Sequence, residues 1–198
     1  MIAVVGSGLA GMAAAARLAR VGHDVVVFEA AAAPGAGIDL ASEPDGAVVT
    51  LPAAWRDLFR KSGRSLDAEL GARGLELVPA PARTYRLSDG AAFDLPTDRG
   101  EQWRTIGSTF GEPVAVAWRD LLDGLDHAWQ VLRRLGLEAE FPGRLTAADR
   151  AVLRPRESLA ALADRVPALA DVVLDIAARL GQDPGRLPGW HAARLAVE

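Results

Sequence analysis

Three glycines near the start of the chain have the spacing of a dinucleotide-binding loop. They lie in one short segment, Gly6-Ser7-Gly8-Leu9-Ala10-Gly11. In this GxGxxG pattern the first glycine permits a tight turn and the second lets the backbone approach a pyrophosphate. The third allows a helix to pack closely on a strand, and the start of that helix offers free N–H groups to phosphate. We therefore expect all six residues to lie against a bound dinucleotide.

The segments around these glycines have the composition that such a loop requires. Residues 2–5 are apolar and predict a short strand buried on both faces, as in a parallel sheet. Residues 10–21 are rich in Ala, Leu and Arg and predict a helix that ends at Gly22. Residues 25–28 are apolar and mostly β-branched and predict a second strand. The order strand, glycine loop, helix, strand indicates a Rossmann-like α/β unit.

The second strand leads directly into an acidic residue, Glu29. A carboxylate at this position accepts hydrogen bonds from the ribose hydroxyls of a dinucleotide and repels a 2′-phosphate. The sequence therefore favours FAD or NAD over NADP as the cofactor.

The chain changes character near residue 79. Before it, residues 30–47 predict a loop, residues 53–62 a helix that ends at Gly63, and residues 75–78 a strand. The segment Pro79-Ala80-Pro81 then suits a crossover between domains. We place one domain over residues 1–78 and a second over residues 79–198.

The second domain is predicted to be a hairpin followed by helices. Residues 84–95 alternate in polarity around Asp89-Gly90, a pair typical of hairpin turns. Further helices are predicted over residues 157–166, 168–180 and 189–198. One long helix carries six apolar residues on a single face: Trp118, Leu121, Leu122, Leu125, Trp129 and Leu132.

The other charged clusters are interpreted as solvated helix surface. Four basic residues cluster around the predicted helix 53–62: Arg56, Arg60, Lys61 and Arg64. Three carboxylates lie opposite the apolar helix face: Asp120, Asp123 and Asp126. A phosphate or membrane contact for the first cluster, and a catalytic role for the second, are the less favoured alternatives.

The string from Val4 to Glu29 resembles the FAD-binding segment of the phytoene desaturase and amine oxidase flavoproteins. Residues 50–59 are similar to a segment of bacterial phytoene desaturase-like proteins, and residues 85–90 and 93–96 to the hairpin that begins their substrate domain. The resemblance implies an N-terminal part of such a protein. Residues 1–78 would be part of the FAD-binding domain and residues 79–198 part of the substrate-binding domain.

The resemblance also implies a function and a cofactor. It implies an FAD-dependent oxidoreductase of carotenoid biosynthesis that removes hydride from an apolar, isoprenoid-like substrate onto flavin. Because the flavin carries that chemistry, no catalytic acid or base is assigned. Where the family has a Gly-Gly-Arg motif near the pyrophosphate, this chain has Gly35-Ala36-Gly37. We count Gly35 and Gly37 among the cofactor-binding residues and expect weak retention of FAD.

Two alternatives stay open. One is an NAD-dependent dehydrogenase with the same nucleotide loop. The other is a truncated, catalytically silent remnant that binds nucleotide weakly, since the family is more than twice as long and this chain ends within a predicted helix. We expect a fold that is incomplete relative to that of the family.

Composition narrows the remaining classes. The chain has 198 residues, no Cys and three His without ligand spacing, which excludes a disulfide scaffold and a Cys-based zinc site. The net charge of −4 argues against a nucleic-acid partner. Residues 1–16 lack the basic start of a signal peptide and contain three glycines. We expect a cytoplasmic protein without a metal site, with peripheral membrane contact open.

Overall fold

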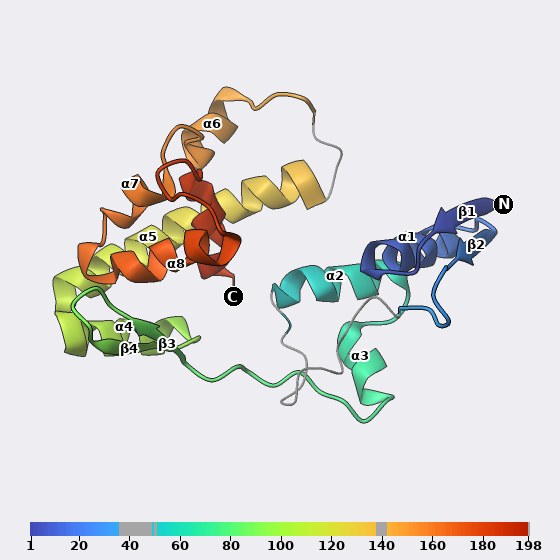
Figure 1. Cartoon of the computed structure of the whole chain (residues 1–198), viewed down its shortest axis with the longest axis horizontal. Coiled ribbons are helices and arrows are strands. Elements are labelled where there is room, and N and C mark those ends of the chain that lie inside the picture. Colours follow the sequence, from blue (N-terminus) through green and yellow to red (C-terminus); the bar gives the residue numbers. More distant parts are fainter. Residues whose placement is uncertain (36–48, 50, 138–141, 198) are drawn as a thin grey trace. The chain divides into compact units, whose positions relative to one another are not determined.

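The computed structural model describes residues 1–35, 49, 51–137 and 142–197 (Figure 1). It divides into two compact units, Met1–Val78 and Pro79–Glu198. We call them unit 1 and unit 2 and describe each by itself.

Unit 1 begins with the expected βαβ arrangement. Strand β1 (Ile2–Val5) is followed by helix α1 (Leu9–Arg20) and strand β2 (Val25–Phe28). The two strands are parallel, with Ile2 opposite Val25 and Val5 opposite Phe28. The strand, helix and strand predicted from the apolar pattern are confirmed within one residue at each end.

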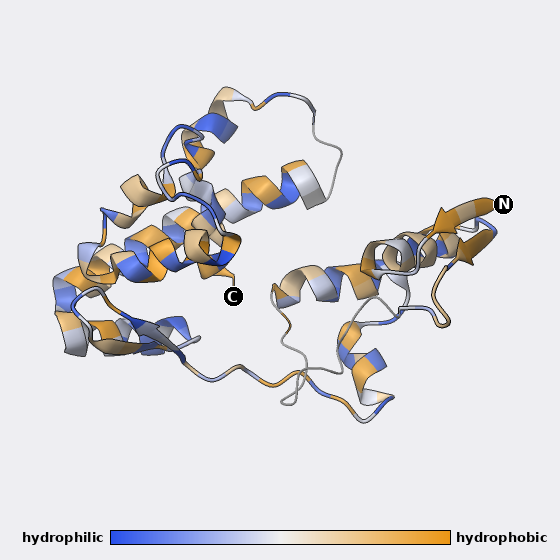
Figure 2. Cartoon of the chain, in the orientation of Figure 1, coloured by the Kyte–Doolittle hydropathy of each residue, from blue (hydrophilic) through white to orange (hydrophobic). Residues whose placement is uncertain are grey.

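The sheet of unit 1 is less buried than predicted. Ile2 and Val4 are half-buried on the side of α1, but Val5 is 87% exposed and Phe28 is 58% exposed. In the part of the chain that the structure describes, β1 and β2 pair only with each other, and α1 covers one face. The expectation of a strand buried on both faces is therefore wrong here. Both strands are strongly hydrophobic in Figure 2.

Two further helices complete unit 1. Helix α2 (Pro52–Ser62) is the predicted helix and ends at Gly63, whereas helix α3 (Leu66–Gly71) was not predicted. The Ser65 side chain caps α3 by accepting a hydrogen bond from the N–H of Ala68 at 3.3 Å. Residues 75–78 form no strand, because no described segment pairs with them. Most of the predicted loop 30–47 lies outside the described residues.

Unit 2 opens with the predicted hairpin. Strands β3 (Arg83–Arg86) and β4 (Ala92–Leu95) are antiparallel and joined through Asp89-Gly90. The hairpin is fastened to helix α8 (Ala170–Leu180). The N–H of Ser88 donates to Asp171 at 2.7 Å, and Arg83 pairs with Asp175 at 3.0 Å.

Two long helices follow the hairpin. Helix α4 (Arg99–Phe110) is capped by Asp98, whose side chain accepts from the N–H of Glu101 at 2.8 Å. Helix α5 (Glu112–Leu132) continues into a π-helical turn, Arg133–Leu137. Four of the six residues on the predicted apolar face of α5 are buried, and the remaining two, Trp129 and Leu132, are half-buried. The helix periodicity is confirmed.

The last helices are shorter and more irregular than predicted. They are α6 (Ala147–Leu153), α7 (Leu159–Ala163), a 3-10 turn (Pro167–Leu169), α8 and a 3-10 helix (Gly189–Ala196). Helix α6 was not predicted, although Thr146 and Asp149 form a capping box at its start.

The predicted α-helix over residues 189–198 is instead a 3-10 helix, and Val197 lies beyond its end. A Cβ atom at Gly189 would lie 3.3 Å from the carbonyl oxygen of Ser158. The chain here runs close against the segment before α7, and the bridge between Ser158 and Pro188 fixes it there.

The core of unit 2 lies between the hairpin and the helices. Its largest fully buried side chains come from α4, α7, α8 and the turns between them: Ile106, Leu159, Val166, Leu169, Val172 and Val173. The apolar residues of α5 pack into the same cluster. Figure 2 shows the alternation of hydrophobic and hydrophilic residues along α5.

Candidate functional site: the loop between β1 and α1

The glycine loop turns sharply at the end of β1. Gly6 has a φ of +92°, a region that other residues rarely adopt, and its N–H donates to the carbonyl of Phe28 at 2.7 Å. Gly8 is the N-cap of α1, and its carbonyl accepts from the N–H of Met12 at 2.9 Å. The chain thus leaves β1, turns once and enters the helix within three residues.

The space beside Gly8 is open. A Cβ atom built on Gly8 would meet no heavy atom within 4 Å. The first N–H groups of a helix have no partner inside the helix, and the helix dipole makes this end positive. No acidic side chain lies in the first turn of α1, and Arg17 and Arg20 lie in its last turn. The loop can therefore accept an anionic group at Gly8.

Gly11 holds the helix against the loop. A Cβ atom at Gly11 would lie 1.9 Å from the carbonyl oxygen of Gly6 and 3.6 Å from Cγ1 of Val4. No side chain fits at the first of these distances. The third glycine of the pattern is therefore required by the packing of α1 on the turn and on β1.

Glu29 is tied to the loop through Ser7. Its Oε2 accepts from the N–H of Ser7 at 2.7 Å and from Ser7 Oγ at 2.5 Å, and its Oε1 accepts from the N–H of Ala31 at 2.8 Å. These hydrogen bonds, the Ser7 hydroxyl first, lower the pKa of Glu29 to about 2. Glu29 is therefore fully ionised at neutral pH, and its side chain is exposed at the edge of the loop.

Ser7 connects three segments. Its side chain is 2% exposed, and its Oγ donates to Glu29 while accepting from the N–H of Gly35 at 2.9 Å. The GxGxxG pattern assigns this position no side-chain role. The structure gives it one, because the hydroxyl joins the loop, the end of β2 and the segment that follows it.

Comparison with known proteins agrees with this geometry. Residues 4–68 match the family model of the NAD(P)-binding Rossmann-like domain. The chain is 32% identical over 163 residues to hydroxyneurosporene desaturase of Cereibacter sphaeroides, covering 78% of this chain and 32% of that protein. It is 32% identical to phytoene dehydrogenase of Streptomyces griseus over 154 residues, covering 74% of this chain and 29% of that protein. A 4,4'-diapophytoene desaturase of Staphylococcus aureus is 33% identical over 148 residues, covering 71% of this chain and 28% of that protein.

The chain is homologous to the N-terminal part of phytoene-type desaturases. It spans about a third of the length of these curated relatives. The resemblance seen between Val4 and Glu29 is thereby confirmed, and so is the Rossmann-like α/β class.

The structure describes three of the four remaining residues that were predicted to bind the cofactor, namely Leu9, Ala10 and Gly35. Leu9 is 45% exposed and Ala10 is exposed, at the start of α1. Gly35 has a φ of +77°, and a Cβ atom on it would lie 3.8 Å from Cε of Met12. Gly37 lies outside the described residues. Ser7 was predicted as part of the loop, but the role of its side chain rests on the contact with Glu29, which the sequence does not reveal.

The basic cluster of unit 1 is paired with acidic side chains. Arg60 and Lys61 pair with Asp57 at 2.6 and 2.7 Å. Arg56 lies 3.9 Å from Asp67, and Arg64 lies 3.6 Å from Glu69. These pairs agree with the interpretation as helix surface.

Among the described residues, neither a candidate metal centre nor a candidate membrane span is found. The described residues contain no group of three or more His, Asp or Glu placed to hold a metal ion. Within the described ranges, no helix has the length and apolar character needed to cross a bilayer.

The open space at Gly8 and the close contact at Gly11 predict opposite effects of substitution. Gly8→Val should abolish nucleotide binding with little change in melting temperature, because the new side chain occupies only the anion space. Gly11→Ala should lower the melting temperature strongly, because its Cβ collides with the Gly6 carbonyl. Calorimetric titration with NAD and thermal unfolding measure both effects. An unchanged dissociation constant for Gly8→Val would contradict the assignment.

The tie between Ser7 and Glu29 predicts a pKa change. In Ser7→Ala the pKa of Glu29 should rise from about 2 toward 4.5, because the largest cause of the lowering is removed. Since the folded value lies below the unfolded value, the stabilisation from ionised Glu29 is present above about pH 4.5 and is lost as the pH falls toward 2. The difference in unfolding free energy between the wild type and Ser7→Ala should therefore shrink as the pH falls from about 4.5 toward 2.

Carboxylate carbon NMR during a pH titration measures the Glu29 pKa directly. Ser108→Ala is the matched control, because this exposed serine bonds only within α4, to the carbonyl of Thr105. A Glu29 pKa that stays near 2 in Ser7→Ala would show that the hydroxyl does not hold the carboxylate.

Proposed function

We propose that unit 1 binds the ADP part of FAD and that the chain contributes this part to an FAD-dependent desaturase. The observation that carries the proposal is the pairing of an open helix N-terminus at Gly8 with an ionised carboxylate at Glu29. The helix N-terminus can bind the pyrophosphate, and the carboxylate can accept hydrogen bonds from the ribose hydroxyls. The desaturase relatives favour FAD as the nucleotide.

The residues present fit the nucleotide. Gly8 lacks the Cβ that would fill the phosphate space, and Glu29 is exposed where the end of β2 meets the loop. Ser7 holds the Glu29 carboxylate in one orientation through two hydrogen bonds. The protein supplies binding and orientation here, and FAD supplies the capacity to accept a hydride.

The substrate proposal follows the relatives' names. Hydroxyneurosporene desaturase and phytoene dehydrogenase are among them. We infer that the parent reaction removes hydride from a C–H bond of an apolar, isoprenoid-like molecule. The net charge of −4 and the paired basic cluster support a small-molecule partner over a nucleic acid.

A second candidate is an NAD-dependent dehydrogenase. It is favoured by the family model, which describes an NAD(P)-binding domain. Glu29 serves the ribose of NAD as well as that of FAD, because both carry an ADP group. The desaturase relatives, which match 71 to 78% of this chain, make FAD the first choice.

Nucleotide choice tests the role of Glu29. We expect the chain to bind NAD at least ~10-fold more tightly than NADP, since the 2′-phosphate meets an ionised carboxylate; tenfold is about 1.4 kcal/mol. Glu29→Gln should reduce this preference, because it removes the negative charge and keeps the side-chain shape. Calorimetry measures both ligands on both proteins. Tighter binding of NADP by the wild-type chain would refute the proposal.

Retention of FAD tests the segment after β2. We expect the purified chain to lose FAD on gel filtration and to show no desaturase activity, because no Arg occurs between residues 21 and 55 to pair with the pyrophosphate. A charge-assisted hydrogen bond contributes about 1.5–3 kcal/mol. Gly37→Arg, which places an arginine at the third position of the family's Gly-Gly-Arg pattern, should therefore tighten FAD binding roughly 10- to 100-fold.

The flavin absorbance that co-elutes with the protein measures retention. Gly71→Arg is the matched control, because it adds the same charge at the end of α3, where φ is not positive and a Cβ meets open space. Stoichiometric flavin on the wild-type chain after gel filtration would contradict the expectation of weak binding.

A further inference from the structure

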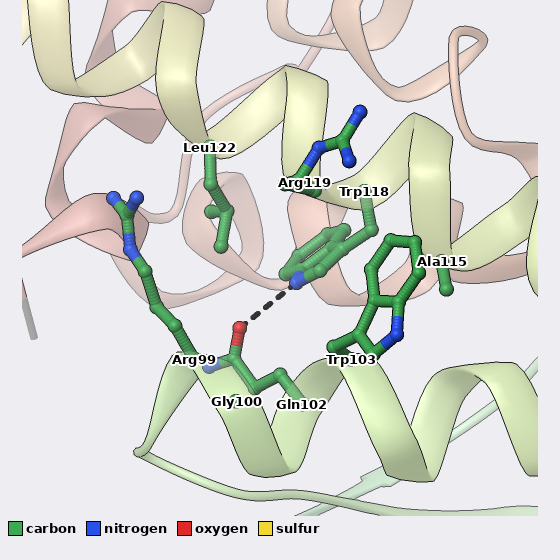
Figure 3. A pocket seen from close by; sticks show the side chains of 8 residues that line it. All are labelled: Arg99, Gly100, Gln102, Trp103, Ala115, Trp118, Arg119 and Leu122. Atoms are coloured by element: carbon green, nitrogen blue, oxygen red, sulfur yellow. Dashed lines mark hydrogen bonds between the residues drawn. The ribbon is translucent and has the colours of Figure 1, made fainter.

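A hollow of about 280 Å³, open to solvent on one side, lies between helices α4 and α5 of unit 2 (Figure 3). Much of its lining is apolar. Trp103 comes from α4, and Ala115, Trp118 and Leu122 come from α5. The volume lies just below the range of ~300–1,000 Å³ typical of small-molecule sites. The hollow can therefore take a ligand of one or two rings.

One wall of the hollow is held rigid. Trp118 is 2% exposed, and its indole N–H donates to Oε1 of Gln102 at 3.0 Å, the bond drawn in Figure 3. The Gln102 side chain is fixed in turn, because its Nε2 donates to the carbonyl of Pro96 at 2.8 Å. The indole of Trp118 cannot turn without breaking this chain of hydrogen bonds. The wall is thus formed before any ligand arrives.

Two cationic side chains complete the lining. Arg99 rises from α4 on one side, and Arg119 extends from α5 near Trp103 (Figure 3). The Arg119 guanidinium lies 5.5 Å from the centre of the Trp103 ring. Among the described residues no carboxylate lines the hollow. A ligand inside it meets aromatic surface and positive charge together.

Both arginines already have acidic partners outside the hollow. Arg99 pairs with Asp123 at 3.1 Å and Arg119 with Asp120 at 2.7 Å. In both pairs each side chain is about half exposed. Ion pairs this exposed hold their partners weakly, since water screens them. Arg99 also donates to the carbonyl of Ala196 at 3.3 Å, whereas Nε and Nη2 of Arg119 both donate to its sequence neighbour Asp120. Arg119 can therefore turn toward a ligand at smaller cost than Arg99.

We propose that this hollow binds a small aromatic carboxylate. The ring lies against the indole of Trp103, in the offset or edge arrangement that aromatic pairs favour. The carboxylate is held by the planar fork of Arg119, with Arg99 as the second cation. A neutral aromatic ligand gains the ring contact alone, and inorganic phosphate gains the charge alone. The site does not depend on nucleotide binding by unit 1.

The experiment titrates the full 198-residue chain with 2-naphthoate and with neutral 2-naphthamide, which has the same ring. The indole N–H signals of the five tryptophans are followed by NMR and assigned with single Trp→Phe variants. We expect 2-naphthoate to shift the signals of Trp103 and Trp118 and to bind at least tenfold more tightly than the amide. Shifts confined to Trp190, which lines a second hollow, would overturn the proposal.

Variants that remove one positive charge then distinguish binding at the hollow from a nonspecific effect of the protein's charge. Arg119→Gln should weaken 2-naphthoate at least tenfold and leave 2-naphthamide unchanged. Arg104→Gln is the matched control, because Arg104 is exposed on α4 but does not line the hollow. Thermal unfolding establishes that both variants fold. Equal affinity for the two ligands, no binding of either, or equal losses in the two variants would each refute the proposal.

Discussion

Helix α1 begins against the carbonyl oxygen of Gly6, at a distance that leaves no room for a side chain on Gly11. This contact fixes where the helix starts relative to the end of β1. The turn at Gly6 that makes the contact also directs Ser7 inward, where it is almost completely buried. From there its hydroxyl reaches Glu29 and Gly35. The positions of the anion space, the carboxylate and the following segment therefore all depend on one close packing of backbone on backbone.

The electrostatics of unit 1 follow from the same geometry. The loop offers phosphate a helix N-terminus and open space at Gly8, and no arginine occurs between Val21 and Trp55. Arg17 and Arg20 lie at the far end of α1, and the basic residues of α2 are engaged with acidic partners on α2 and α3. Attraction for a dinucleotide must come mainly from backbone dipoles, which act over the first turn of a helix. We expect the proposed site to select by shape and by the Glu29 charge, and to bind weakly.

Elements with a long or repeated pattern could be predicted from the sequence. The βαβ unit, the hairpin around Asp89-Gly90 and the apolar face of α5 were all predicted and are present. Helices α3 and α6 were missed because each has only six or seven residues and no full period of apolar spacing. Their caps, Ser65 and the Thr146–Asp149 box, were the available signals. Residues 75–78 have the composition of a strand, but strands need partners, and composition does not supply them.

In the candidate site too, local features could be predicted from the sequence and long-range contacts could not. The glycines and Glu29 are set by local spacing, so the pattern identifies them. The role of Ser7 arises from a contact between residues far apart in sequence, and a hydroxyl between two glycines carries no local sign of it. The same holds for the hollow beside α4, which no pattern in the sequence predicts. Its position depends on how two helices meet, which periodicity along one helix does not determine.

The two proposed sites differ in which groups would contact the ligand: backbone groups in unit 1 and side chains in unit 2. This difference determines how substitutions would affect each site. In the nucleotide site proposed for unit 1 the binding groups are backbone N–H groups, so replacing Leu9 or Ala10 would alter a side chain without removing them. Binding there fails through strain or lost space, at Gly6, Gly8 or Gly11. In unit 2 the lining consists of side chains on rigid helices, and Trp118 is locked by Gln102. A single substitution there changes the charge or shape that a ligand meets while the helices stay in place. Ligand selectivity can therefore shift in unit 2 by side-chain replacement alone, whereas nucleotide binding in unit 1 is retained or lost with the geometry of the loop.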